Sequence, residues 1–214
     1  MLGKLTGAFR RSLADVKNEF RVMRLHHASA RRAAGLAPRD LKLHIACGPN
    51  VKPGWTNIDL LPSADLQLDL REPWPFPDNS ASIIYSEHFF EHLEYPLEAE
   101  RFLAESMRVL APGGLFSVGV PDTEWPLRAY VEGDAEYFRL AREQWHPAWC
   151  DTRMHQINFH FRQGQEHKYA YDFETLERVL AKAGFVSITR RDFDPSLDSE
   201  ARRIGTLYAE GRKS

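Results

Sequence analysis

The feature that most constrains this chain is a regular alternation, from residue 41 onward, of short apolar segments with helical ones. Short runs bounded by Gly, Pro and Asn predict strands at 41–46, 55–60, 64–69, 81–86, 115–120, 185–193 and 205–210. Helical patterns are expected at about 89–110 and at 172–183, where Asp172 is a suitable N-cap and Gly184 ends the helix. Strands that alternate with helices indicate an α/β protein, with a mainly parallel sheet and helices on both faces.

The first 40 residues form a basic extension to this domain. They carry nine Lys or Arg against three Asp or Glu, whereas the remaining 174 residues carry 19 against 27. A basic arm therefore precedes an acidic body at 41–214. A broad nucleic-acid-binding surface needs a basic face, so we expect no nucleic-acid partner for the body.

Apolar residues in the arm recur at steps of three or four, which predicts an N-terminal amphipathic helix. A basic amphipathic helix can lie on an anionic membrane, here as a peripheral contact through residues 1–25, or it can pack on protein. We favour packing, on its own domain or on a second copy in a homodimer, because the stripe has no Trp or Tyr. A further helical piece at 28–39 is expected to end in a linker at 35–38. The stripe consists of Leu2, Leu5, Phe9, Leu13, Val16, Phe20 and Met23.

The cysteine content and the hydropathy pattern indicate a cytoplasmic location. The chain has only Cys47 and Cys150, which do not make a disulfide framework and which fit a reducing compartment. No run of about 18 apolar residues predicts a transmembrane helix. The first 30 residues also lack the pattern of a secretory signal.

Candidate ligand-binding residues follow the predicted strands, because ligands of open α/β sheets bind beyond the carboxyl ends of the strands. Small residues after the first strand let a ligand approach the backbone. A carboxylate after the second strand can accept hydrogen bonds from two ribose hydroxyls, and one after the third can accept from an adenine amine. The expected cofactor-binding residues are Ala46, Cys47, Gly48, Asp59, Leu60, Asp69, Leu70, Ser86, Glu87 and His88.

The spacing of these residues favours an adenosine ligand without phosphate. A dinucleotide needs a helix N-terminus for its pyrophosphate and an acidic residue about 20 positions after the glycines. Here Gly48 and Asp59 are only 11 positions apart, and Pro49 and Pro53 disfavour a full helix between them. This pattern disfavours a nicotinamide-dependent oxidoreductase, and S-adenosylmethionine is the better fit.

Five short motifs occur in order between residues 43 and 114. They are LHIACG at 43–48, GWTNID at 54–59, FPDNSAS at 76–82, EHFFEHL at 87–93 and RVLAPGG at 108–114. Together they resemble the motifs of the class I S-adenosylmethionine-dependent methyltransferases, and the resemblance is close to a bacterial group associated with surface-polysaccharide biosynthesis. Two positions depart from the family pattern: Ala46 stands in place of a glycine, and His44 stands near the usual acidic residue.

The resemblance implies a Rossmann-like, doubly wound, mainly parallel sheet of seven strands with an antiparallel edge strand, and it implies methyl transfer from S-adenosylmethionine. The aromatic and His-rich segment at about 125–171 would be an insertion that forms the acceptor pocket, or else a small satellite core. The acidic body and the lack of an N-P-P-Y-type element favour a small-molecule, sugar or glycan-precursor acceptor. A hydroxyl acceptor needs a base, for which the candidates are His88, Asp122 and His167.

Two other interpretations remain open. The chain could be a non-catalytic member that binds the cofactor or regulates a partner. The pattern His88-x-x-Glu91-His92 also fits an inverted zinc-protease motif, which with Glu166 as third ligand would make the chain a zinc hydrolase. We expect no metal, since the motif directly follows a strand and since the other set of candidate ligands matches no compact zinc site. That set is His146, Cys150 and His155.

Overall fold

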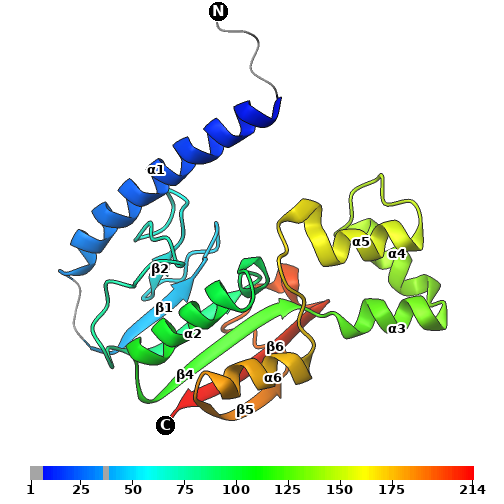
Figure 1. Ribbon diagram of the computed structural model, residues 1–214. Coiled ribbons are helices and arrows are strands. Elements are labelled where there is room, and N and C mark those ends of the chain that lie inside the picture. The colour runs from blue at the N-terminus through cyan, green and yellow to red at the C-terminus, as the bar shows by residue number, and fades with distance from the viewer. Residues whose placement is uncertain (1–6, 36–38) are drawn as a thin grey trace, which may run out of the picture.

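The computed structural model describes residues 7–35 and 39–214, and it contains one six-stranded sheet (Figure 1). The strand order is β2-β1-β3-β4-β6-β5, in which β2, β1, β3 and β4 run parallel and β6 is antiparallel to both of its neighbours. The strands are β1 (Leu41–Ile45), β2 (Thr56–Ile58), β3 (Ala81–Glu87), β4 (Leu110–Pro121), β5 (Phe185–Arg191) and β6 (Thr206–Lys213).

The prediction of seven strands with an antiparallel edge strand is wrong in two respects. The segment 64–69 forms only an isolated bridge between Leu66 and Ile58. Its next backbone amide, that of Gln67, donates to the Ser29 hydroxyl at 2.9 Å, so a side chain takes the place of a ladder partner. The antiparallel strand β6 lies one position inside the sheet, and β5 forms the edge.

The helices are α1 (Gly7–Ala33), α2 (Leu97–Val109), α3 (Glu124–Glu132), α4 (Ala135–Gln144), α5 (Arg153–Arg162) and α6 (Phe173–Lys182), with short 3₁₀ turns η1 (Phe90–His92), η2 (Gln163–Gln165) and η3 (Glu200–Arg202). The helix expected at 89–110 is therefore divided, and Pro96 stands directly before α2. The predicted cap of α6 is confirmed, because Asp172 Oδ1 accepts from the Thr175 amide at 2.8 Å.

Helices cover one face of the sheet among the described residues, where two faces were expected. Both α2 and α6 lie in front of the strands in Figure 1, and Phe102 of α2 contacts Phe116 of β4, with ring centroids 6.2 Å apart. On the opposite face, the segment 192–205 lies over Tyr85, whose hydroxyl donates to Asp198. The β1–β2 connection contains no helix, as its prolines predicted, so no crossover helix from this connection covers that second face.

Helix α1 contacts the domain through a different line of residues from the one predicted. Val22, His26, Ser29 and Ala33 are buried, at spacings of three or four. The described part of the predicted stripe, from Phe9 to Met23, is 40–61% exposed, so packing of this stripe on its own domain is wrong. Leu2, Leu5 and linker residues 36–38 lie outside the described part of the chain.

The segment 125–171 folds into α3, α4 and α5, which lie beyond the end of β4 (Figure 1). Ala129, Tyr137, Phe138 and Ala141 form a small buried cluster there, and Trp125 packs against it. This is the satellite core that the sequence allowed. No described helix is long and apolar enough to cross a membrane.

One buried histidine in the sheet gives the fold a pH dependence. Burial lowers the pKa of His44 from 6.5 to about 4, and its Nδ1 lies 3.1 Å from Asn57 Oδ1. The imidazole stays neutral in the folded protein, whereas the unfolded chain takes up a proton below pH 6.5. The stabilisation is therefore present above pH 6.5 and is lost as the pH falls toward 4.

We expect His44→Gln to flatten this pH dependence. In urea unfolding, the native protein should lose about 2 kcal/mol more than the variant between pH 7 and pH 5, since each pKa unit corresponds to about 1.4 kcal/mol. The exposed His155 on α5 provides the control, and His155→Gln should behave like the native protein. Equal pH profiles for the native and His44→Gln proteins would assign the effect to another group.

Candidate active site

Two cavities lie at the carboxyl ends of the parallel strands. The strand-end cavity, of about 440 Å³, is lined by Ala46 and Cys47 after β1 and by Glu87 at the end of β3. The aromatic cavity, of about 330 Å³, is lined by residues after β3 and β4 and by the α3–α5 segment. Arg202 lines both cavities, which makes them neighbours.

The chain turns sharply after β1. Ala46 and Gly48 have positive φ values of 51° and 54°, a conformation that glycine adopts readily and alanine rarely. A Cβ at Gly48 would meet nothing within 4 Å, so the backbone faces open space there. Burial raises the pKa of the Cys47 thiol to about 11, which keeps it protonated and unsuited to act as a nucleophile.

Asp59 joins this turn to the end of β2. Its Oδ2 accepts from the Gly48 amide at 2.9 Å, and its Oδ1 accepts from the Leu61 amide at 2.9 Å. Each carboxylate oxygen accepts about two hydrogen bonds, so both retain capacity for a further donor. The neighbouring Leu60 is half-buried. Two hydroxyls of a sugar can therefore donate to Asp59 without displacing either backbone amide.

Glu87 provides the buried charge of the strand-end cavity. Its carboxylate accepts from the Tyr208 hydroxyl at 2.8 Å and lies 3.8 Å from Arg202. Burial raises the pKa of Glu87, and the Tyr208 hydrogen bond opposes that shift. The preceding residue, Ser86, is fully buried, and its hydroxyl has no hydrogen-bond partner among the described residues.

The structure does not bring Asp69 and Leu70 into the strand-end cavity. Arg71 holds the Asp69 carboxylate in a bidentate ion pair, with distances of 2.9 and 2.7 Å. Asp69 faces a separate cavity of about 690 Å³ between α1 and the chain at 69–73. Leu70 belongs to the main core. The alternation of apolar and polar residues at 64–69 indicated a partly buried segment, but it did not indicate that Arg71 pairs with Asp69.

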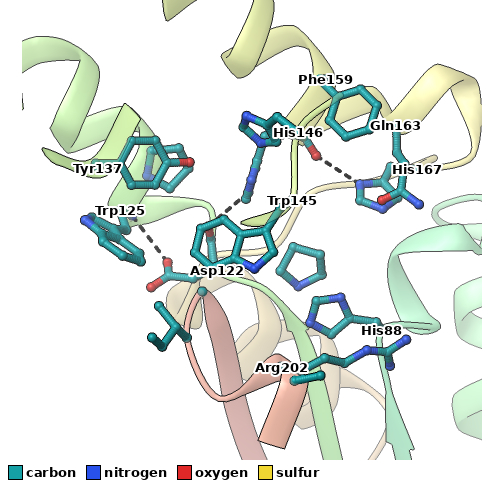
Figure 2. Close-up of a pocket in the computed structure, with 16 residues that line it drawn as sticks. His88, Asp122, Trp125, Tyr137, Trp145, His146, Phe159, Gln163, His167 and Arg202 are labelled. Carbon is teal, nitrogen blue, oxygen red and sulfur yellow. Dashed lines mark hydrogen bonds between the residues drawn. The ribbon is translucent and has the colours of Figure 1, made fainter. Parts of the chain in front are cut away.

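Aromatic rings from the inserted helices form the walls of the second cavity (Figure 2). Trp125 comes from α3, Tyr137 from α4 and Phe159 from α5, and Trp145 directly follows α4. The Trp125 and Tyr137 rings meet edge to face, with centroids 4.9 Å apart. The insertion is therefore both a satellite core and a cavity wall. The three base candidates His88, Asp122 and His167 also line this cavity.

Hydrogen bonds fix the protonation pattern of the two candidate histidines. Thr206 donates its hydroxyl hydrogen to the Arg202 carbonyl at 2.6 Å, so it accepts from His88 Nε2 at 2.8 Å. His167 Nδ1 donates to the His160 carbonyl at 3.0 Å. Burial lowers the pKa of both rings, so both are neutral at pH 7. His88 Nδ1 and His167 Nε2 therefore carry free lone pairs.

Asp122 is held more tightly than the histidines. Its Oδ1 accepts from the Glu124 amide at 2.9 Å at the start of α3, and its Oδ2 lies 3.7 Å from Arg190. Its backbone carbonyl accepts from His160 Nε2 at 3.1 Å. Asp122 Oδ2 is therefore the oxygen that can accept a proton from a bound methyl acceptor.

Three residues that no sequence motif indicated belong to the site: Arg202 and His160 line the aromatic cavity, and Tyr208 donates to Glu87. Arg202 lies in η3, in a segment whose place over the sheet no local pattern indicates. The structure does not bring together the set of candidate metal ligands that the sequence disfavoured, namely His146, Cys150 and His155. The His146 ring is hydrogen-bonded to Gln156, and the His155 ring is hydrogen-bonded to Asp151. The Cys150 thiol points to the His155 carbonyl instead.

Comparisons with known proteins agree with this architecture. A Thermotoga maritima protein described as a possible histamine N-methyltransferase has a TM-score of 0.51 at 19% identity, over 96% of this chain and 98% of that one. A structure described as a complex between the Haloferax volcanii Trm112 methyltransferase activator and the putative methyltransferase has a TM-score of 0.50 at 15% identity, over 98% of this chain and 99% of that one. A Bordetella parapertussis chain described as a possible exported protein has a TM-score of 0.51 at 15% identity, over 88% and 66%. These likenesses show a shared fold.

No curated protein sequence matches the chain. A family model described as a methyltransferase domain matches residues 2–118, which is more than half of the chain. The match spans the predicted nucleoside-binding strand ends at 46–48, 59–60 and 86–88. The chain therefore belongs to the methyltransferase domain family and is an S-adenosylmethionine-dependent methyltransferase.

Proposed function

We propose that the enzyme methylates a small molecule, sugar or glycan precursor held in the aromatic cavity. The observation that carries this proposal is the position of that cavity. It adjoins the strand-end cavity through Arg202 and is lined by aromatic walls and by three candidate bases. Its volume of about 330 Å³ lies at the small end of the range for ligand pockets, which suits a compact acceptor.

We assign cofactor binding to the strand ends around the strand-end cavity. Bound S-adenosylmethionine supplies an activated sulfonium methyl group for in-line transfer. The open backbone at 46–48 admits the methionine portion, and Asp59 accepts from the two ribose hydroxyls. Asp69 and Leu70 are left out of this assignment, because Arg71 holds the Asp69 carboxylate and Leu70 lies in the main core. Leu60, Ser86, Glu87 and His88 complete the assigned set.

Sugars and glycan precursors suit the acceptor cavity because aromatic faces pack against the apolar faces of a ring while polar groups bind its hydroxyls. This agrees with the resemblance to the group associated with surface-polysaccharide biosynthesis. The acidic body, with 19 basic against 27 acidic residues after residue 40, is unsuited to nucleic acid. The enzyme must align the acceptor atom with the methyl group and exclude water, and the walls formed by α3–α5 can do both.

A hydroxyl acceptor would give up its proton to a base in the cavity. His88 and His167 are neutral and each carry one free lone pair, which is the protonation state that a base requires. Asp122 is the third candidate, through its Oδ2. A free amine or a thiolate acceptor needs no base. The loss of methylation rate on replacing these three residues would therefore distinguish a hydroxyl acceptor from those two classes.

The two thiols support a cytoplasmic location. Cys47 and Cys150 are both buried and unpaired, which fits a reducing compartment. We propose that location for the enzyme.

We predict that Asp59→Ala weakens S-adenosylmethionine binding by about 1.5–3 kcal/mol, the range for hydrogen bonds to a charged group. Titration calorimetry with S-adenosylmethionine and S-adenosylhomocysteine measures this loss directly. Asp65→Ala is the matched control, since Asp65 makes a similar structural bond to the Asn57 amide in the same loop. Unchanged affinity in a folded Asp59→Ala protein would refute the ribose assignment.

We predict that Trp145→Ala raises the KM for the acceptor roughly tenfold, because one lost aromatic contact costs about 1.4 kcal/mol. Cofactor affinity should stay unchanged. The assay follows S-adenosylhomocysteine formation across a panel of nucleotide sugars and glycan fragments. Trp149, which is 60% exposed and outside the cavity, provides the control variant Trp149→Ala. An equal change in KM for the two variants would contradict the proposal that the acceptor binds in this cavity.

We further propose that the exposed stripe of α1 packs against a second copy of the chain. Val16, Phe20 and Met23 line the groove beside residues 69–73, and Phe20 is 61% exposed. Exposed apolar patches of this kind mark interaction sites. The basic arm and the acidic body have complementary charge, which favours contact between copies.

Sedimentation of the full chain should show a dimer, and Phe20→Asp should shift it to a monomer with unchanged cofactor affinity. Val131 on α3 is 85% exposed and lies outside the groove, so Val131→Asp should leave the dimer intact. A monomeric full chain would contradict the proposal. Salt-dependent co-sedimentation with anionic liposomes would instead assign the stripe to a membrane surface.

A further inference from the structure

Glu91 and His92 of η1 meet His167, which follows η2, beside the aromatic cavity. One ligand atom from each of the three side chains lies within 4.8 Å of the others. Glu91 Oε1 is 3.7 Å from His92 Nε2, and the two imidazole rings meet edge to face with centroids 5.1 Å apart. The backbone reinforces this arrangement, because the Glu91 carbonyl accepts from the Lys168 amide at 2.8 Å.

The Glu91 carboxyl group lies in a position that a carboxylate alone does not favour. Its side chain is only 2% exposed, and neither oxygen has a hydrogen-bond partner among residues 7–35 and 39–214. Burying a charge without partners is costly, so buried carboxylates are paired or coordinate metals. The group that faces these oxygens must therefore be a proton or a cation.

The two histidines of this group each keep one ring nitrogen unprotonated. His92 Nδ1 donates to the Glu166 carbonyl at 3.1 Å, and His167 Nδ1 donates to the His160 carbonyl at 3.0 Å. Both rings therefore direct an unprotonated Nε2 away from their backbone partners. A histidine that binds a metal through one nitrogen usually donates its other N–H to a carbonyl or carboxylate, and both histidines here have this arrangement.

We propose that Glu91, His92 and His167 form a binding site for a divalent transition-metal ion such as Zn²⁺. Two imidazoles and one carboxylate are a common ligand set for zinc sites that keep an open fourth position. A cavity of about 10 Å³, lined by Glu91, His167 and Tyr171, lies beside the set and is close to the size of one water molecule.

This site revises the expectation of no metal and differs from the zinc pattern considered in the sequence. His167 takes the place of Glu166, which contributes only its backbone carbonyl to His92. His88 Nδ1 lies 3.9 Å from Glu91 Oε1 and is outside the three-residue set. With the ion bound, His167 acts as a ligand, and His88 and Asp122 remain as base candidates.

The proposal does not depend on the identity of the acceptor or on methyl transfer. It does place the ion next to the acceptor cavity, because His160 and His167 line both that cavity and the small one. A cation there would attract an oxygen ligand of the acceptor.

The test uses the purified full chain, treated with a chelator, desalted, loaded with Zn²⁺ and desalted again. Elemental analysis should find about one zinc ion per chain, and competition with a chromogenic chelator gives the dissociation constant. Glu91→Gln and His92→Gln should each raise that constant at least 100-fold. His155→Gln, on an exposed histidine paired with Asp151, should leave it unchanged.

Circular dichroism and the affinity for S-adenosylmethionine, measured on the same variants, separate loss of the metal site from loss of the fold or of the cofactor site. If Glu91→Gln fails to fold, the Co²⁺-loaded native protein decides: nitrogen and oxygen ligation with no thiolate charge-transfer band supports the site, and thiolate ligation overturns it. Retention of no zinc by the native chain, or equal zinc affinity in a folded Glu91→Gln protein, would also overturn the proposal.

Discussion

The parallel pairing of β1, β3 and β4 is the constraint on which the rest of the site depends. The register aligns Ile45 with Ser86, and Glu87 with Gly119, so three successive strands end along one edge. The turn residues that follow these strands therefore lie at the same edge of the sheet, beyond the last hydrogen bonds between the strands. Both cavities open at this edge, because backbone leaving a parallel sheet diverges there and leaves a crevice.

The second face of the sheet is closed by charge pairing. Asp198 is buried and accepts from Arg191 and from the Tyr85 hydroxyl. These bonds hold the segment 192–205 across β3 and β4, where a crossover helix would otherwise lie. The same segment carries Arg202 to the boundary between the two cavities. An ion pair in the sheet therefore positions a cation in the site.

Burial and backbone carbonyls together determine the chemistry of the histidines. Burial lowers the pKa of His88, His92, His160 and His167, which keeps these rings neutral at pH 7. The second ring nitrogen of His92 and of His167 is left free, since Nδ1 in each donates to a carbonyl. A group of neutral imidazoles with directed lone pairs can accept a proton or bind a cation. Such a cluster lies where the aromatic cavity meets η1.

The sequence by itself determined the α/β class, six of the seven predicted strands, the cap at Asp172 and the places of Ala46, Asp59 and Glu87 at strand ends, because these depend on local periodicity and turn chemistry. Tertiary structure decided what local pattern does not encode. Segment 64–69 forms a single bridge to β2, and its Gln67 amide donates to the hydroxyl of Ser29, 38 residues away. Arg71 pairs with the Asp69 carboxylate, and Glu91 lies close to His167, which is 76 positions later in the sequence. Contacts between distant residues depend on how the helices pack, and a sequence pattern carries no direct record of that packing.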